Sequence, residues 1–138
     1  MQPRITVYKN LKTGIYYVQP HTIGPVAATW FGEPTVIFSA DFRSKIGQAV
    51  LSNLEKFGTE KYDPARSIRR MPDQQMRFLK ENIEVIVLKC ESGGLTVCPL
   101  RREKGGRVGH DDDVINLTQQ ELPHKLADAI AEAFNRAT

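Results

Sequence analysis

The stretch that decides the fold is residues 83–100, IEVIVLKCESGGLTVCPL. Its apolar runs, Ile83 to Cys90 and Leu95 to Leu100, flank the turn-forming residues 91–94, a pattern typical of a β-hairpin. The run Ile86 to Leu88 is continuous, so both faces of the first strand are apolar. The sequence therefore predicts a strand in the centre of a sheet that is covered on both sides.

Upstream of this hairpin, the chain predicts a second hairpin and then a long helix. Residues 5–8 and 15–18 are rich in β-branched and aromatic residues and are separated by turn formers. Residues 20–35 contain so many Pro and Gly residues that we expect an irregular segment there. A short strand at 35–38 precedes a helix that begins near Ser39 or Asp41 and ends before Gly58. The apolar stripe of this helix is Ile46, Ala49, Val50, Leu54 and Phe57.

Three further elements complete the prediction. A short helix is expected from Pro72 to Asn82, with Met76 and Leu79 facing inward. Residues 101–113 are charged and glycine-bearing, so we expect a mobile loop. After a strand at 114–117, Thr118 and Glu121 have the spacing of a helix capping box. The apolar stripe of the last helix is Leu126, Ala129, Ile130, Ala133 and Phe134.

The strand and helix at 36–54 resemble those at 114–134, and their helical stripes coincide at an offset of 80 residues. Two amphipathic helices can look alike by chance, so the similarity alone leaves open whether it is a repeat. The structural interpretation is two strand–helix units against one sheet. We therefore expect one α/β (α+β) domain spanning 1–138, with a mixed, largely antiparallel central sheet, two long helices and one short helix.

Composition limits the classes of function. The 138 residues are 41% hydrophobic and 25% charged, and the net charge is +3 without a polybasic arm, which makes dedicated nucleic-acid binding unlikely. The two cysteines are too few for a disulfide framework or a zinc site. Neither a signal-like segment nor a membrane-spanning apolar stretch is present, so we expect a cytoplasmic protein. A chain of this length can bury a sizeable core, so we expect no structural cofactor.

The most notable polar motif is His110-Asp111-Asp112-Asp113. Carboxylates and imidazole are metal ligands, but four neighbouring residues cannot all converge on one ion and no second cluster completes a shell. The alternatives are a solvated acidic loop and an acidic contact patch for a basic partner. We assign this motif, together with Glu103, to a candidate contact surface.

Two other segments offer binding groups. Trp30 and Phe31 lie among loop-forming residues, where they either plug the end of the core or serve as binding anchors. The basic residues of the Arg66–Arg77 region could follow a phosphate backbone, although Asp73 and other acidic residues interrupt them. No nucleophile motif accompanies any histidine or cysteine, so the sequence gives no support for an enzyme. A hydrolase using His110 and its aspartates is a remote alternative.

Four segments together resemble the CdiI immunity proteins of bacterial contact-dependent growth inhibition. They are the strand Gly14–Val18, the helix Ile46–Leu54, the hairpin segment Thr96–Pro99 and the helix Leu126–Phe134. The resemblance implies a non-catalytic cytoplasmic protein that binds the C-terminal toxin domain, commonly a nuclease, of a cognate CdiA effector. It supplies no binding residues, because such interfaces are specific to each pair.

Combining this resemblance with the charge pattern gives a predicted toxin contact. It comprises Glu103, His110, Asp111, Asp112, Asp113, Trp30 and Phe31. Carboxylates would meet the basic surface that a nuclease uses for phosphate, and the net charge of +3 requires this complementarity to be local. The alternative function is a small RNA-binding accessory module that uses the Arg66–Arg77 region.

Overall fold

The computed structural model describes residues 1–25, 28–30, 32–59, 61–66 and 72–138. These residues form an eight-stranded sheet with the order β3-β2-β1-β5-β6-β7, in which β4 also pairs with β2 and β8 with β6. The predicted α+β fold is confirmed, and every pairing among the described strands is antiparallel. The strands are β1 (Arg4–Asn10), β2 (Tyr16–Ile23), β3 (Ala28–Trp30), β4 (Thr35–Ile37), β5 (Asn82–Lys89), β6 (Leu95–Glu103), β7 (Gly106–Gly109) and β8 (Ile115–Leu117).

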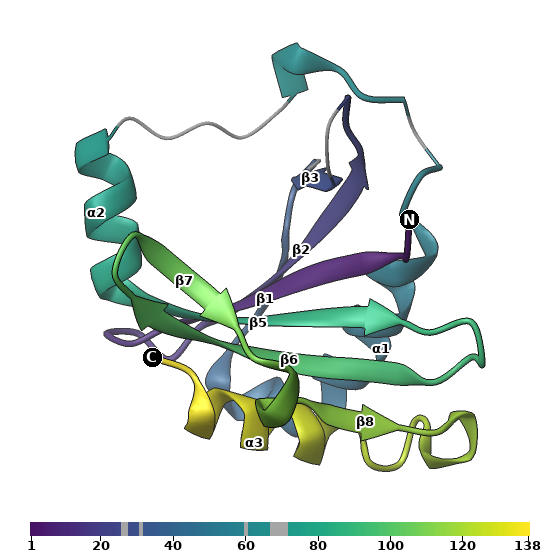
Figure 1. The fold of residues 1–138 in the computed structure, drawn as a ribbon. Coiled ribbons are helices and arrows are strands. Elements are labelled where there is room, and N and C mark those ends of the chain that lie inside the picture. The colour runs from purple at the N-terminus through teal and green to yellow at the C-terminus, as the bar shows by residue number, and fades with distance from the viewer. Residues whose placement is uncertain (26–27, 31, 60, 67–71) are drawn as a thin grey trace.

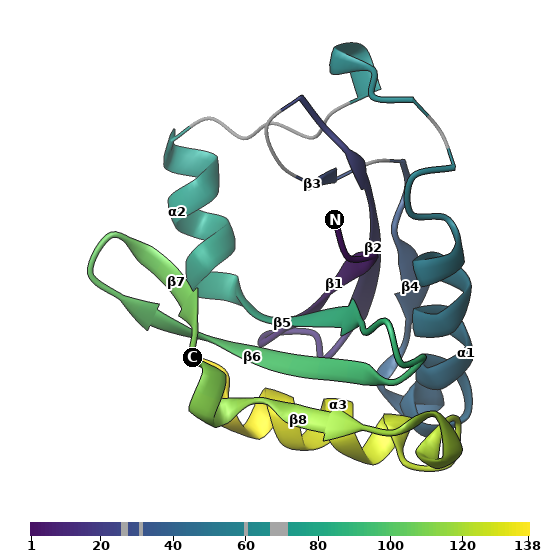
Figure 2. The same cartoon turned by 45° about the vertical axis from the view of Figure 1, so that its right-hand side comes forward.

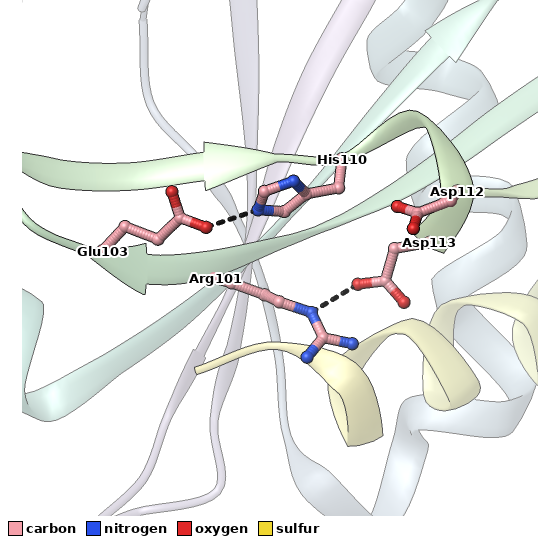
Figure 3. A pocket seen from close by; sticks show the side chains of 5 residues that line it. All are labelled: Arg101, Glu103, His110, Asp112 and Asp113. Atoms are coloured by element: carbon pink, nitrogen blue, oxygen red, sulfur yellow. Dashed lines mark hydrogen bonds and ion pairs between the residues drawn. The ribbon is translucent and has the colours of Figure 1, made fainter.

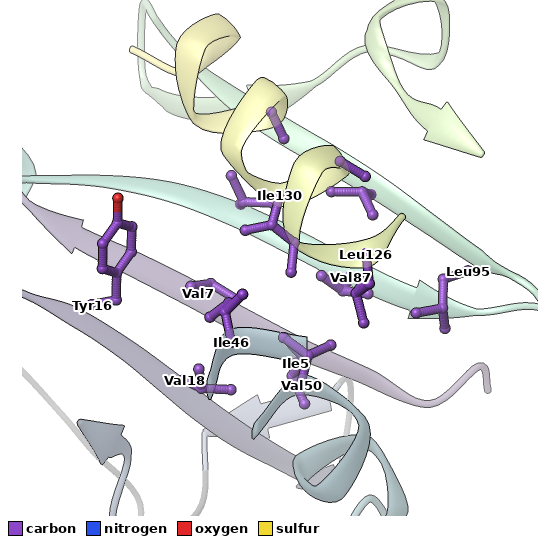
Figure 4. Close-up of a cluster of buried hydrophobic side chains, with 14 of the residues drawn as sticks. Ile5, Val7, Tyr16, Val18, Ile46, Val50, Val87, Leu95, Leu126 and Ile130 are labelled. Atoms are coloured by element: carbon purple, nitrogen blue, oxygen red, sulfur yellow. The ribbon is translucent and has the colours of Figure 1, made fainter. Parts of the chain in front are cut away.

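Two helices, α1 (Phe42–Glu55) and α3 (Leu126–Arg136), cover one face of the sheet (Figures 1 and 2). Their predicted stripes are largely buried: Ile46, Val50, Leu126 and Ile130 are fully inaccessible to solvent. Ala49 and Phe57 are only half-buried, and Phe57 lies beyond the end of α1. Figure 4 shows these side chains meeting the inward-facing residues of the strands. Side chains alternate between the faces of a strand, so the consecutive residues of β1 and β5 divide between this core and the opposite face.

The third helix, α2 (Pro72–Glu81), lies on the opposite face of the sheet (Figure 2). Its inward residue is Phe78, whose ring packs edge-on against Tyr8 of β1 with the ring centroids 4.9 Å apart. The expectation that Met76 faces inward is wrong, because 58% of Met76 is exposed. Leu79, the other residue expected to face inward, is half-buried.

Two parts of the described chain have the same order of elements, β1-β2-β3-β4-α1 and β5-β6-β7-β8-α3, and we call them the two halves. Each half contributes one of the two expected strand–helix units, β4–α1 and β8–α3, to the same sheet. In each half the second strand pairs at its start with the fourth strand and at its end with the third. Tyr16 pairs with Ile37 in the first half, and Leu95 pairs with Leu117 in the second. At the junction of the halves, β1 and β5 pair so that Thr6 lies opposite Ile86, its counterpart 80 residues later. A pseudo-two-fold axis therefore passes between these two residues.

The irregular segment expected at 20–35 is wrong for its first part, because β2 continues through Pro20 to Ile23. Proline has no backbone N–H, so it is disfavoured inside a sheet. Pro20 lies where the outer neighbour of β2 changes from β4, which pairs up to Val18, to β3, which pairs from His21. Pro99 occupies the matching position in β6. Each proline thus falls at a gap in the pairing.

The loop expected at 101–113 is also largely wrong, because β6 extends to Glu103 and turns back into β7. The acidic residues that follow form a short 3-10 turn, η3 (Asp111–Asp113). The Thr118–Glu121 capping box is present, but it caps a 3-10 turn, η4 (Gln119–Glu121), and α3 begins only at Leu126. Two more 3-10 turns are η1 (Ser39–Asp41) and η2 (Pro64–Arg66).

No helix in the described part of the chain is long and apolar enough to cross a membrane.

Candidate functional site

The predicted contact residues of the second half gather around a surface hollow of about 400 Å³ (Figure 3). Its lining consists of Arg101 and Glu103 from the end of β6, His110 after β7, and Asp112 and Asp113 from η3. The β6–β7 hairpin positions them because Arg101 pairs with Val108 and Leu100 with Gly109. Four of the five residues in the predicted acidic surface therefore share this hollow, which we call the acidic hollow.

Asp113 has a structural role in the acidic hollow. Its carboxylate accepts a hydrogen bond from Arg101 Nε at 2.6 Å, and its backbone carbonyl accepts one from Arg136 Nη1 of α3 at 3.1 Å. The hydrogen bond from Arg101 is the main reason that the pKa of Asp113 lies below its usual value. Asp113 therefore holds η3 against β6 and α3.

A second pair crosses the acidic hollow. His110 Nε2 lies 2.5 Å from Glu103 Oε1, and both side chains remain partly exposed. This contact links the residue after β7 to the end of β6, so it closes the hairpin on the side of the hollow. Glu103 and His110 are therefore available at the surface as a pre-formed pair.

Asp111 and Asp112 are different from Asp113. Both are exposed, and neither forms a hydrogen bond or ion pair with another described residue. Since Arg101 offsets Asp113, these two residues carry the unbalanced negative charge of η3. They are free to meet a cation of a partner, with Asp112 on the wall of the hollow.

The geometry argues against a metal centre here. His110 turns to Glu103 and Asp113 to Arg101, so the neighbouring side chains diverge (Figure 3). Within the described residues, no group of three His, Cys, Asp or Glu side chains could hold a metal ion. The arrangement is suited to charge recognition by oriented carboxylates on a rigid support.

Trp30, the one predicted aromatic contact among the described residues, is not brought to the acidic hollow. Trp30 ends β3 and pairs with His21, whereas Phe31 lies outside the described residues. The strand order places β3 and β7 at opposite ends of the main sheet path. Trp30 therefore does not share the acidic hollow, and its assignment to the toxin contact stays a prediction. In sequence terms, residues 31–34 and 110–114 connect the third strand to the fourth in the two halves, and Trp30 and Gly109 end the two third strands.

One buried polar pair was missed by the sequence analysis. Thr6 Oγ1 and His21 Nε2 lie 2.8 Å apart on the face opposite α1 and α3, and His21 Nδ1 has no partner among the described residues. Burial, aided by the charge of Arg4, lowers the pKa of His21 from 6.5 to about 4. If the predicted strand had been extended past Pro20, the alternation of its side chains would have placed His21 on the face opposite the main core.

The thiols of the two cysteines lie outside the main core. Cys90 and Cys98 are both half-buried and on the face opposite α1 and α3. Burial raises the pKa of Cys98 above its usual value, and the negative charges of Asp113 and Asp111 raise it further. The thiol therefore stays protonated at neutral pH and is a poor nucleophile. A Cβ at Gly109 would lie 2.6 Å from Cys98 Sγ, so a larger residue where β7 ends would have to displace this thiol.

Comparison with known proteins gives a fold but no family. No family model and no curated protein matches this chain. Among solved structures, it is similar to a protein of unknown function, NMB0488, from Neisseria meningitidis. The TM-score is 0.72 at 14% sequence identity, and the match covers 100% of this chain and 96% of the other. At this identity the similarity establishes a shared fold alone.

Proposed function

We propose that this chain is a cytoplasmic, non-catalytic immunity protein of contact-dependent growth inhibition. In this proposal it binds the C-terminal toxin domain, a nuclease, of a cognate CdiA effector and so protects the cell that makes it. The supporting observation is the acidic hollow with the adjacent Asp111. Asp111 and Asp112 are exposed and have no partner among the described residues, while Asp113 and Arg101 hold their turn in place. Such a pre-organised surface favours recognition, because little order is lost on binding.

Neutralisation would be electrostatic and steric. A nuclease needs cationic side chains to bind phosphate, and those side chains are complementary to exposed carboxylates. The protein has a net charge of +3, so the attraction comes from the local arrangement of charges at η3. Once docked, the β6–β7 hairpin and η3 would cover the surface that the nuclease uses for its substrate.

The test measures the kinetics with which this protein binds the C-terminal toxin domain of its cognate CdiA effector. In Asp111→Asn/Asp112→Asn, the association rate at low salt should fall about threefold to tenfold, because steering charges act mainly on association. Asp113 is left intact, so the Arg101 pair remains. A matched control, Glu55→Gln/Glu91→Gln, removes two exposed carboxylates outside the hollow. Equal rates in wild type and both variants would remove the acidic hollow from the interface.

The second proposal is RNA binding by the Arg66–Arg77 region. Arg77 is exposed on α2 and has no carboxylate partner among the described residues, although residues 67–71 lie outside them. Binding of a short RNA that weakens steeply with salt would support this function. RNA binding unaffected by Arg77→Gln would argue against this use of α2.

A further inference from the structure

A groove lies between α2 and the β6–β7 hairpin, on the other side of the hairpin from the acidic hollow. It has a volume of about 380 Å³. Its lining comprises Met76, Leu79, Lys80, Arg102, Gly105, Gly106 and Arg107, and Glu103 reaches it at the end of β6. Neighbouring residues of a strand point to opposite faces, so Arg101 faces the hollow and Arg102 faces the groove. We call this second site the α2 groove.

Both walls of the α2 groove are fastened together. Arg107 is only 3% exposed, and its guanidinium binds Glu84 Oε1 at 2.9 Å and the carbonyl of Leu79 at 2.6 Å. It also donates to the carbonyl of Asn82, and Arg102 donates to that of Leu79. These carbonyls belong to the end of α2 and the start of β5, where helix carbonyls need external donors. The groove is therefore pre-formed.

The floor and one wall of the α2 groove are apolar. Met76 is 58% exposed, an unusual environment for a large flexible side chain, and Leu79 is half-buried beside it. Gly105 and Gly106 form the hairpin turn, where an added Cβ would meet no atom within 4 Å. The turn thus leaves the groove open at this end, so an apolar side chain of a partner could contact Met76.

The rim of the α2 groove is positively charged. Lys80 and Arg102 form no ion pair with any described carboxylate, and neither do Arg77 and Lys104 nearby. The charge of Arg107 is offset by Glu84, and Glu103 binds His110 on the side of the acidic hollow. The uncompensated charge of the rim is therefore cationic.

We propose that the α2 groove binds an acidic amphipathic segment of a protein partner. Its apolar side chains would contact Met76 and Leu79, and its carboxylates would meet Lys80 and Arg102. Single-stranded nucleic acid fits less well, because it requires aromatic surfaces on which bases stack. No aromatic side chain lines the groove among the described residues, since Phe78 turns towards Tyr8. This binding site is separate from the toxin contact proposed at the acidic hollow.

The test is an NMR titration of the full chain at low salt with three probes. The first is a peptide in which Leu-Leu pairs alternate with Glu-Glu pairs, the second has Lys in place of each Glu, and the third is an octamer of uridine. We expect the acidic peptide to shift the Met76 methyl and the amides of Gly105 and Gly106. Lys80→Glu should weaken its binding by about threefold to fivefold, and Met76→Ala by a similar factor.

A matched control is Lys56→Glu, which makes the same charge change at an exposed position after α1 and should leave the affinity unchanged. Arg102 and Arg107 are left intact because they hold the groove together. The proposal is overturned if the acidic and basic peptides bind equally, if Lys80→Glu has no effect, or if no probe shifts these resonances. Displacement of the acidic peptide by the uridine octamer would instead assign the groove to nucleic acid.

Discussion

At the scale of single residues, His21 makes stability depend on pH. Its pKa of about 4 in the folded protein lies below the ordinary value of 6.5, so between these values the unfolded chain binds a proton that the folded chain does not. Folding stability is unaffected by His21 above pH 6.5 and decreases as the pH falls towards 4. The shift corresponds to a loss of up to about 3 kcal/mol.

The variant His21→Leu separates this effect from other titrations. Leucine already occupies the equivalent position 100 in the second half, where it is buried. We expect wild type to lose more stability than the variant between pH 7 and pH 4.5, as measured by urea unfolding, because only wild type can gain the proton on unfolding. If NMR shows the His21 ring titrating near pH 6.5, the prediction is contradicted.

The acidic motif shows what sequence can and cannot specify at this scale. Its three aspartates are equivalent in sequence, yet Arg101 and Arg136 engage Asp113 and leave Asp111 and Asp112 free. Arg101 precedes Asp113 by 12 residues and Arg136 follows by 23. The presence of a charged surface was predictable, but the division of roles depends on how β6, η3 and α3 come together.

At the scale of elements, the stripe of α3 supports a quantitative prediction. Ile130 is fully buried between the helix and the sheet, so Ile130→Ala should reduce the free energy of unfolding by about 2–5 kcal/mol. Leu11→Ala is the control, because Leu11 is 56% exposed. Chemical unfolding checks both variants, and a change below about 0.5 kcal/mol for Ile130→Ala would show that the stripe is not part of the core.

The attachment of α2 supports another prediction. Arg107→Met removes the buried guanidinium, and with it the ion pair to Glu84 and the hydrogen bonds from Arg107 to the carbonyls of Leu79 and Asn82. We expect a loss of about 3–5 kcal/mol, the usual effect of breaking one partner of a buried ion pair. Hydrogen exchange should accelerate in α2 more than in α3. Unchanged protection of α2 would mean that its other contacts, such as the Phe78–Tyr8 packing and the Lys12–Glu81 ion pair, are sufficient to hold the helix.

Element prediction succeeded where the signal was local. Both central hairpins and the two long helices follow from short apolar patterns and turn residues, and the structure confirms them. It failed at β2 beyond Pro20 and at the β6–β7 hairpin. Pro20 is tolerated only because two different strands flank it, and the Gly105–Gly106 turn is surrounded by charge, so neither strand extension has an apolar pattern of its own.

At the scale of the whole molecule, the two halves share one core. β1 pairs with β5 over seven residues, and α1 and α3 contribute to the same buried cluster. Fragments 1–59 and 60–138, made separately, should therefore lack cooperative unfolding, because each exposes half of a core. Mixing them should restore the circular dichroism spectrum and the slow exchange of the Val7 and Val85 amides. A fragment that unfolds cooperatively alone would show that its half is autonomous.

The axis between Thr6 and Ile86 has a consequence for how this protein can change over time. In a homodimer, a residue beside a two-fold axis faces its own copy, so one mutation alters both sides at once. Here the two sides are encoded separately, and they already differ: Thr6 binds His21 while Ile86 cannot. The same independence applies at the strand connections, where one copy has Trp30 and Phe31 and the other has His110 to Asp113. One connection can therefore change in sequence while the other continues to support the fold.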